Sequence, residues 1–137
     1  LVIFARFVPE IDAISKLLAE KGIRHSVISG EIKNRSEQVQ QFQENSEVKV
    51  FVGQIQTTGL GLTLTAANTA IFYSMDFNYA NYSQARARIH RIGQRNTCTY
   101  IHLVAKDTID EKVLKTLQRK EDVAKLLVDN WHTFFRR

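Results

Sequence analysis

The sequence has little of the chemistry that cross-links a chain or binds a metal. Among 137 residues there is one cysteine, Cys98, so no disulfide partner exists within the chain. Cys98 lies in an alternating, strand-like run, where a small buried side chain is the expected role. The four histidines and this cysteine show no metal-ligand spacing, so we expect no metal site. Such a chain suits a reducing compartment, the cytoplasm or the nucleus.

Long hydrophobic runs and targeting signals are also missing. No apolar stretch approaches the length of a membrane span, and no signal-peptide layout is visible, so we expect no membrane partner. With 44% hydrophobic and 24% charged residues, the composition is that of one compact globular domain. The chain opens directly on apolar residues without an initiator methionine, and we therefore expect it to be an excerpt from a larger protein.

The sequence has no phosphate-binding loop of the Gly-x-x-x-x-Gly-Lys-Ser/Thr type, and no acidic pair follows a predicted strand. Acidic residues are also absent between positions 84 and 95. Four arginines in that stretch account for most of the net charge of +5: Arg86, Arg88, Arg91 and Arg95. This local excess indicates an anionic partner, and a nucleotide and a nucleic-acid backbone both fit.

Strand-like and helix-like segments alternate along the chain, which predicts an α/β fold with a parallel sheet flanked by helices. The single proline, Pro9, opens a predicted helix that Gly22 closes, and a polar helix is expected from Lys33 to Glu44. A buried strand is predicted at residues 1–5, and further strands are predicted at 24–28, 48–52, 69–74 and 98–104.

A long C-terminal helix follows the last predicted strand. Thr108 and Glu111 form a capping box, and the helix face is apolar at Ile109, Val113, Leu117, Ala124 and Val128. Five basic and five acidic residues between positions 110 and 129 cancel, so we expect packing rather than nucleic-acid binding. We therefore divide the chain into a lobe at residues 1–107 and a brace helix with its tail, 108–137, packing on that lobe.

The stretch from Gln84 to Gln94 separates into two stripes at helical spacing. Gln84, Arg88 and Arg91 share one predicted face, and Ala85, Ile89 and Ile92 form an apolar stripe beside it, with Gly93 ending the helix. Parallel guanidinium groups suit a compact polyanion such as a triphosphate. On its own, the pattern fits a solvated basic face equally well. Arg86 lies off this face, and we expect it to be solvated.

The order of motifs resembles lobe 2 of the helicase-like ATPases of superfamily two, in the SWI/SNF-type branch. The segment from Thr57 to Ala67 is similar to motif V, and the stretch ending in Arg-Ile-Gly-Gln94 is similar to motif VI. Residues 1–7 resemble motif IV, and Ser29 to Arg35 with Phe42 resembles the next family block. The resemblance covers essentially the whole chain and implies a RecA-like parallel sheet flanked by helices.

Several positions depart from the family pattern, although Gln84, Arg88 and Arg91 match it. The departures are Ala5, Arg6, Gln54, Ile55, Thr58, Phe77, Tyr79 and Ala87.

The resemblance implies the second motor lobe of an ATP-dependent translocase of double-stranded DNA, similar to a chromatin remodeller. A first RecA-like lobe of the same protein would bind ATP and Mg²⁺, and this lobe would close over them with Arg91 as an arginine finger and Arg88 beside it. ATP contacts are expected at Gln84, Arg88, Arg91, Gly59 and Gly61. Contacts to the DNA backbone are expected at Arg6, Ser29, Gly30, Lys33, Arg35, Thr57 and Thr58, whose types track phosphates without reading bases.

Two other functions remain open at the level of sequence. One is a non-catalytic binding or scaffolding module that keeps the fold, and the other is the corresponding lobe of an RNA helicase. Since the chain holds half of an ATP site, we expect it to be inactive in isolation and the protein with both lobes to be an ATP hydrolase.

Overall fold

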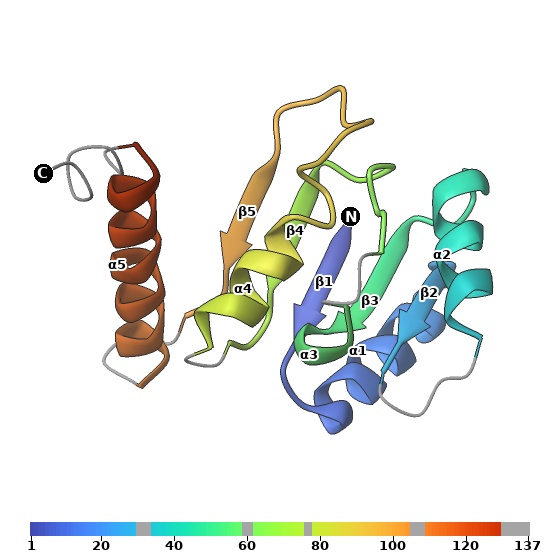
Figure 1. Ribbon diagram of the computed structural model, residues 1–137. Helices are drawn as coiled ribbons and strands as arrows, with labels where there is room; N and C mark the ends of the chain where they lie inside the picture. The colour runs from blue at the N-terminus through green and yellow to red at the C-terminus, as the bar shows by residue number, and fades with distance from the viewer. Residues whose placement is uncertain (30–33, 59–61, 76–77, 105–108, 130–137) are drawn as a thin grey trace, which may run out of the picture.

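A five-stranded parallel sheet forms the centre of the molecule (Figure 1). The computed structural model describes residues 1–29, 34–58, 62–75, 78–104 and 109–129. The strand order is β2-β3-β1-β4-β5, with β1 at Val2–Ala5, β2 at His25–Ile28, β3 at Val50–Gln54, β4 at Thr69–Phe72 and β5 at Thr99–His102. Every pairing is parallel. The predicted fold class is confirmed, and all five predicted strands are present.

Over the described ranges, four helices connect the strands, and a fifth follows the last strand. They are α1 at Val8–Glu20, α2 at Arg35–Glu44, α3 at Ile55–Thr58, α4 at Tyr79–Arg86 and α5 at Ile109–Asp129. Pro9 lies in the first turn of α1, where a backbone N–H has no helical partner to lose. The Phe7 backbone N–H there donates to Glu10 Oε1 at 3.1 Å. Gly22, with φ of +69°, ends the helix as the sequence predicts.

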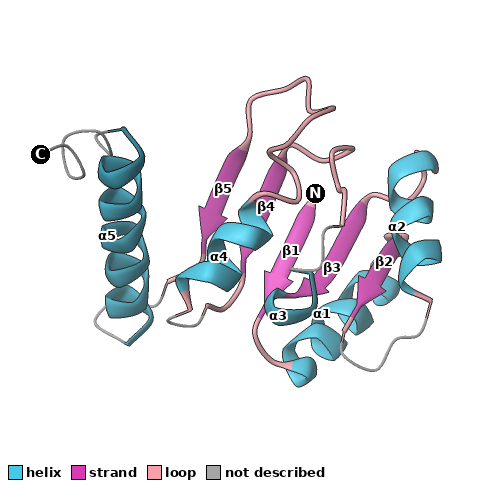
Figure 2. Ribbon diagram, in the orientation of Figure 1, coloured by secondary structure: helices cyan, strands magenta, loops and turns pink. Residues whose placement is uncertain are grey.

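The two faces of the sheet are covered unequally. Side chains alternate along each strand, so Ile3 and Ala5 of β1 pack with α1, while Val2 and Phe4 belong to the core on the opposite face. That larger core is covered by α2, α3, α4 and α5, and Figure 2 shows α3 and α4 in front of the sheet. The larger core therefore lies on the face that carries the arginine stretch.

The arginine stretch is less helical than predicted. Helix α4 begins at Tyr79 and ends at Arg86, and the prediction of a helix reaching Gly93 is wrong. The Gln84 carbonyl accepts a hydrogen bond from Arg88 Nε at 2.8 Å, while the Arg88 backbone N–H donates to the Ala85 carbonyl. An arginine side chain thus takes the carbonyl that a continuing helix would offer to the backbone N–H of Arg88.

The predicted apolar stripe is present only in part. Ala85 and Ile89 are fully buried, but Ile92 is fully exposed, because the chain has left the helical path before it. Gly93 has φ of +103°, which suits a turn that other residues adopt only with strain.

Helix α5 joins the larger core through Val113 and Leu117, both buried as predicted. The side chains of Ile109, Ala124 and Val128 lie outside the described part of the chain, as do Thr108 of the predicted capping box and the tail 130–137. The division at residues 107 and 108 stays a prediction. Within the described residues no helix is both long and apolar enough to cross a membrane.

We expect Phe72→Ala to lower the free energy of unfolding by about 3–5 kcal/mol. Phe72 is fully buried, with its ring centroid 5.2 Å from that of Phe4 and 5.0 Å from that of Tyr82. The neighbouring Tyr73 is 44% exposed, so Tyr73→Ala is a matched control that should cost about 0.5 kcal/mol or less. Urea denaturation of the 137-residue chain measures both, and equal losses would contradict the assigned faces.

Candidate functional site

Arg88 and Arg91 converge on one main-chain carbonyl. Arg88 Nη1 lies 3.4 Å from the Leu62 carbonyl oxygen, and Arg91 Nη1 donates to the same oxygen at 2.9 Å. Arg88 is buried, with 9% of its surface exposed, whereas Arg91 is exposed. The predicted pairing of these arginines in space is therefore present, although the turn after α4 brings them together and not the face of a helix.

The environment of Arg88 is unfavourable for a cation. Burial, and then the charge of Arg91, lower the pKa of Arg88. Its described hydrogen bonds go to the carbonyls of Gln84 and Leu62, which carry only partial charge. An anion placed against the two guanidinium groups would relieve their repulsion and replace the solvation that burial removes. The geometry thus favours binding of a phosphate or a carboxylate.

Residues 87–93, which follow α4 and carry Arg88 and Arg91, are called the arginine turn. Gln94 joins this turn to the segment before β4. Its Nε2 is within hydrogen-bond distance of the carbonyl oxygens of Thr65 at 3.3 Å, Ala67 at 2.6 Å and Ile89 at 3.0 Å. The Leu64 backbone N–H donates to the Arg88 carbonyl at 2.9 Å across the same junction. Sequence reasoning missed this role, although Gln94 ends the Arg-Ile-Gly-Gln motif that could have pointed to it.

Gln43 of α2 holds the other side of that segment. Its Nε2 donates to Thr65 Oγ1 at 3.2 Å, and its Oε1 accepts from the Ala66 backbone N–H at 2.7 Å. Residues 64–67 are therefore held between α2 and the turn that carries Arg88 and Arg91, two positions beyond the Leu62 carbonyl. The sequence offered no signal for Gln43 beyond its place on a polar helix.

The other residues predicted to contact ATP are less well placed. The side chain of Gln84 is exposed on α4, and the part of this residue that meets Arg88 is its carbonyl. Gly59 and Gly61 lie outside the described residues. No group of three or more histidine, cysteine or acidic side chains suited to a metal occurs in the part of the chain that the structure describes.

The predicted DNA contacts gather at the carboxyl ends of the strands. Arg6 follows β1 and is exposed, with its guanidinium carbon 4.9 Å from the Phe7 ring centroid. Ser29 follows β2 but is only 6% exposed, and Arg35 is half-buried at the start of α2. Thr57 and Thr58 belong to α3, which follows β3, and the structure describes their backbone but not their side chains. Gly30 and Lys33 lie outside the described residues. Ends of parallel strands share one edge, so Arg6, Ser29 and helix α3 form a row along that edge.

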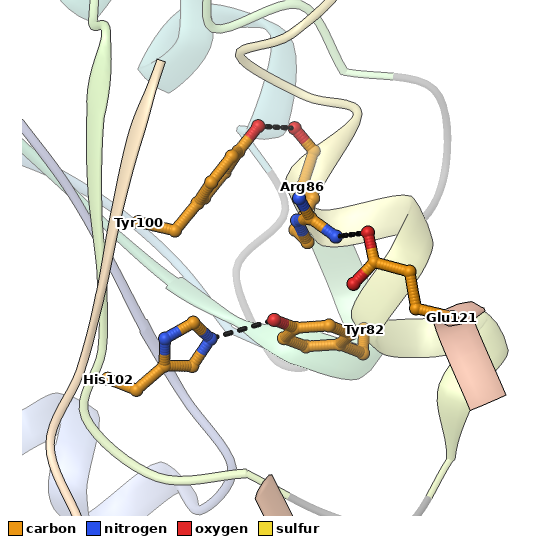
Figure 3. A network of polar contacts seen from close by, with 5 residues as sticks. All are labelled: Tyr82, Arg86, Tyr100, His102 and Glu121. Carbon is orange, nitrogen blue, oxygen red and sulfur yellow. Dashed lines mark hydrogen bonds and ion pairs between the residues drawn. The ribbon is translucent and has the colours of Figure 1, made fainter. Parts of the chain in front are cut away.

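Arg86 is not a solvated residue, and that expectation is wrong. Its Nη1 forms an ion pair with Glu121 of α5, and its guanidinium carbon lies 4.6 Å from the ring centroid of Tyr100 (Figure 3). The sequence could not show this contact, because Glu121 is 35 positions away along the chain.

We expect Gln94→Ala to lower the free energy of unfolding by about 1–3 kcal/mol, since it leaves buried carbonyls without their donor. Gln40→Ala is the control: this exposed glutamine of α2 donates to Glu44 at 3.2 Å, and its loss should cost about 0.5 kcal/mol or less. Urea denaturation of both variants checks this. A Gln94 variant as stable as the control would show that Gln94 does not clamp the segment before β4 to the arginine turn.

Comparison with known proteins identifies the fold. Residues 1–93 match the model of the helicase conserved C-terminal domain. The chromatin-remodeling ATPase INO80 of Candida albicans is 36% identical over 132 residues, which cover 95% of this chain and 10% of that protein. An uncharacterized ATP-dependent helicase of Mycoplasma genitalium is 34% identical over 136 residues, covering 97% of this chain and 13% of that protein.

A solved structure agrees. The C-terminal part of the Fun30 ATPase domain matches with a TM-score of 0.79 and 26% identity, covering 85% of this chain and 38% of that one. The chain thus spans a minor part of these relatives, including 10% and 13% of the two curated proteins. It belongs to the helicase conserved C-terminal domain family and is similar, over nearly its whole length, to SNF2-family ATPases such as INO80 and Fun30.

Proposed function

We propose that this chain is the second motor lobe of an ATP-dependent translocase of double-stranded DNA, with Arg91 and Arg88 completing an ATP site on the first lobe. The observation that carries the proposal is the convergence of these two guanidinium groups on the Leu62 carbonyl. The family adds support, because its INO80 relative is named an ATPase. Parallel guanidinium forks match phosphate oxygens in geometry as well as charge.

The residues present fit the phosphate end of ATP but not its magnesium ion. Arg88 and Arg91 offer donors in a partly buried, positively charged turn. The described residues offer no cluster of carboxylates for Mg²⁺, and the sequence has no phosphate-binding loop. In this proposal the first lobe therefore coordinates Mg²⁺ and supplies the phosphate-binding loop. ATP, when bound, supplies the phosphoryl group that water receives. Further contacts to ATP are proposed at Gln84, Gly59 and Gly61.

The two arginines differ in what they can do. Arg91 is exposed, so its guanidinium can reach a group presented by another lobe. Arg88 is buried and held by the carbonyl of Gln84, so it acts as a fixed charge behind the finger. Positive charge held in advance at this place stabilises negative charge that develops in the transition state.

The row of residues at the carboxyl edge of the sheet supports a track for the DNA backbone. Arg6 and Arg35 supply cations there, and the proposed contacts at Ser29, Gly30, Lys33, Thr57 and Thr58 would add hydroxyl groups, backbone N–H groups and a further cation. Closure of the two lobes on ATP, and reopening after hydrolysis, would move this row along the duplex.

We expect Arg91→Ala to lower DNA-stimulated ATP turnover of the protein with both lobes by roughly 10³- to 10⁵-fold. Nucleotide affinity should stay within about twofold, because a finger acts on the transition state. Arg91→Lys should rescue little, since lysine keeps the charge but not the planar fork. The control is Arg24→Ala, whose side chain is 58% exposed. A defect confined to nucleotide affinity, or an equal loss for Arg24→Ala, would refute the assignment.

Binding of the 137-residue chain to DNA should be weak, indifferent to sequence and strongly reduced by salt. Arg6→Ala and Arg35→Ala should each lower the salt slope by about one phosphate contact, while Arg119→Ala on the exposed side of α5 should leave it unchanged. Titration of labelled duplexes of unrelated sequence across a salt series measures this. An affinity that does not change with salt would contradict phosphate tracking.

A further inference from the structure

Arg86 is enclosed between two helices and two aromatic rings. Its guanidinium carbon lies 4.6 Å from the ring centroid of Tyr100 on β5 and 5.6 Å from that of Tyr82 on α4. Glu121 of α5 forms an ion pair with it, and only 29% of the Arg86 side chain is exposed (Figure 3). Its Nε is buried and has no hydrogen-bond partner. The surroundings therefore hold a cation through one carboxylate and two ring faces.

The ion pair with Glu121 stabilises the charged form of Arg86. Burial acts to lower the pKa of Arg86, but the hydrogen bond and the charge of Glu121 outweigh it, so the pKa is raised. Burial, and then the charge of Arg86, lower the pKa of His102, which disfavours a second cation beside Arg86. Removal of the Glu121 carboxylate would leave a partly buried cation with no partner of opposite charge, which is strongly unfavourable.

The rings are themselves fixed to the sheet. Tyr82 Oη is hydrogen-bonded to His102 Nε2 at 2.7 Å, and the His102 ring stacks on Phe72 with centroids 5.1 Å apart and planes 6° apart. Phe72 is fully buried in the larger core. Arg86 is thus held against a rigid surface, and the ion pair ties α5 to that surface.

The backbone of Arg86 is held at the point where the arginine turn begins. Its carbonyl accepts a hydrogen bond from Tyr100 Oη at 3.1 Å and one from the His90 backbone N–H at 3.3 Å. Two residues later, Arg88 donates to the Gln84 carbonyl and approaches that of Leu62. Arg86 therefore anchors the start of the turn that carries Arg88 and Arg91, and Gln94 anchors its end.

We propose that Arg86 is a positioning residue through which α5 orients Arg88 and Arg91. The Arg86–Glu121 ion pair holds the end of α4 against Tyr100. The end of α4 in turn fixes the position of the arginine turn that follows it. Movement of α5 away from α4 breaks the pair and lets the turn shift, so the placement of α5 controls the arginine finger. This inference rests on the function proposed above, in which the two arginines act on ATP.

The test uses the protein with both lobes and the variants Glu121→Gln and Arg86→Gln. A displacement of about 1 Å in a catalytic group costs up to roughly 100-fold in rate, so kcat should fall about 10- to 100-fold. KM for ATP should change by less than about twofold, because the lost interaction acts on the transition state. The double variant should be no slower than the slower single variant, since both changes remove one shared interaction.

Two controls separate positioning from other effects. The first is the exposed pair of Arg24 and Glu47, with side chains 58% and 72% exposed and an N–O distance of 2.6 Å; Glu47→Gln should leave kcat unchanged. The second is Ile11→Ala, a fully buried residue on the opposite face of the sheet, which lowers stability without touching the network. A full kcat in Glu121→Gln, or an equal fall in Ile11→Ala, would overturn the inference.

A readout without ATP keeps this inference distinct from the proposed function. The Leu64 amide donates to the Arg88 carbonyl, so hydrogen exchange at this amide in the 137-residue chain reports on the turn. We expect the Leu64 amide to exchange faster in Glu121→Gln than in the unchanged chain. In Glu47→Gln its exchange rate should be unchanged. If Arg91→Ala keeps its turnover, the proposed function fails. If Arg91→Ala is inactive but Glu121→Gln has normal kcat and normal exchange, only the role of Arg86 fails.

Discussion

Two like charges held side by side in a partly buried turn are the constraint on which the rest of this lobe depends. Arg88 and Arg91 meet at the Leu62 carbonyl, and burial together with their mutual repulsion lowers the pKa of Arg88. Such a pair separates unless the backbone around it is fixed. The fold supplies that restraint at both ends of the turn, through Gln94 on the segment before β4 and through Arg86 on α4. Binding of an anion is then the step that removes the repulsion.

The parallel sheet lies beneath this turn and ends at the edge proposed to follow DNA. All five strands run in one direction, so the segments after β1, β2 and β3 meet at the carboxyl edge, where Arg6 and Ser29 lie. Helix α4 starts beyond the end of β4 and runs back across the larger core, so the chain reaches Arg88 and Arg91 before it enters β5. One layer of hydrogen-bonded strands therefore connects the two regions. A rigid connection of this kind is what a lobe needs if closure at one region is to move the other.

The sequence was sufficient for the sheet and insufficient for the end of α4, and it predicted the proximity of Arg88 and Arg91 from a shared helical face that the structure does not contain. Apolar or alternating runs bounded by polar turns predicted every strand, including the edge strand β5, whose residues are exposed or half-buried. Helical spacing predicted too long a helix at α4. The apolar pattern of Ala85, Ile89 and Ile92 cannot show that Arg88 Nε occupies the Gln84 carbonyl, to which the backbone N–H of Arg88 would donate in a helix. The clamps by Gln43 and Gln94 were equally hidden. Each depends on a segment more than twenty positions away, which spacing within one helix cannot reveal.

The same limitation explains why Arg86 looked solvated, and it shows how partner chemistry divides one basic stretch into two roles. Arg86 meets a carboxylate, so its charge is cancelled and its pKa rises, which makes it a structural group. Arg88 meets main-chain carbonyls, which leave its charge uncompensated, while burial and then the charge of Arg91 lower its pKa, and this makes it suited to an external anion. Two residues of the same type, two positions apart, differ because α5 brings Glu121 to one of them. Since that carboxylate arrives on a separate helix, the arrangement of the arginines depends on where α5 is docked.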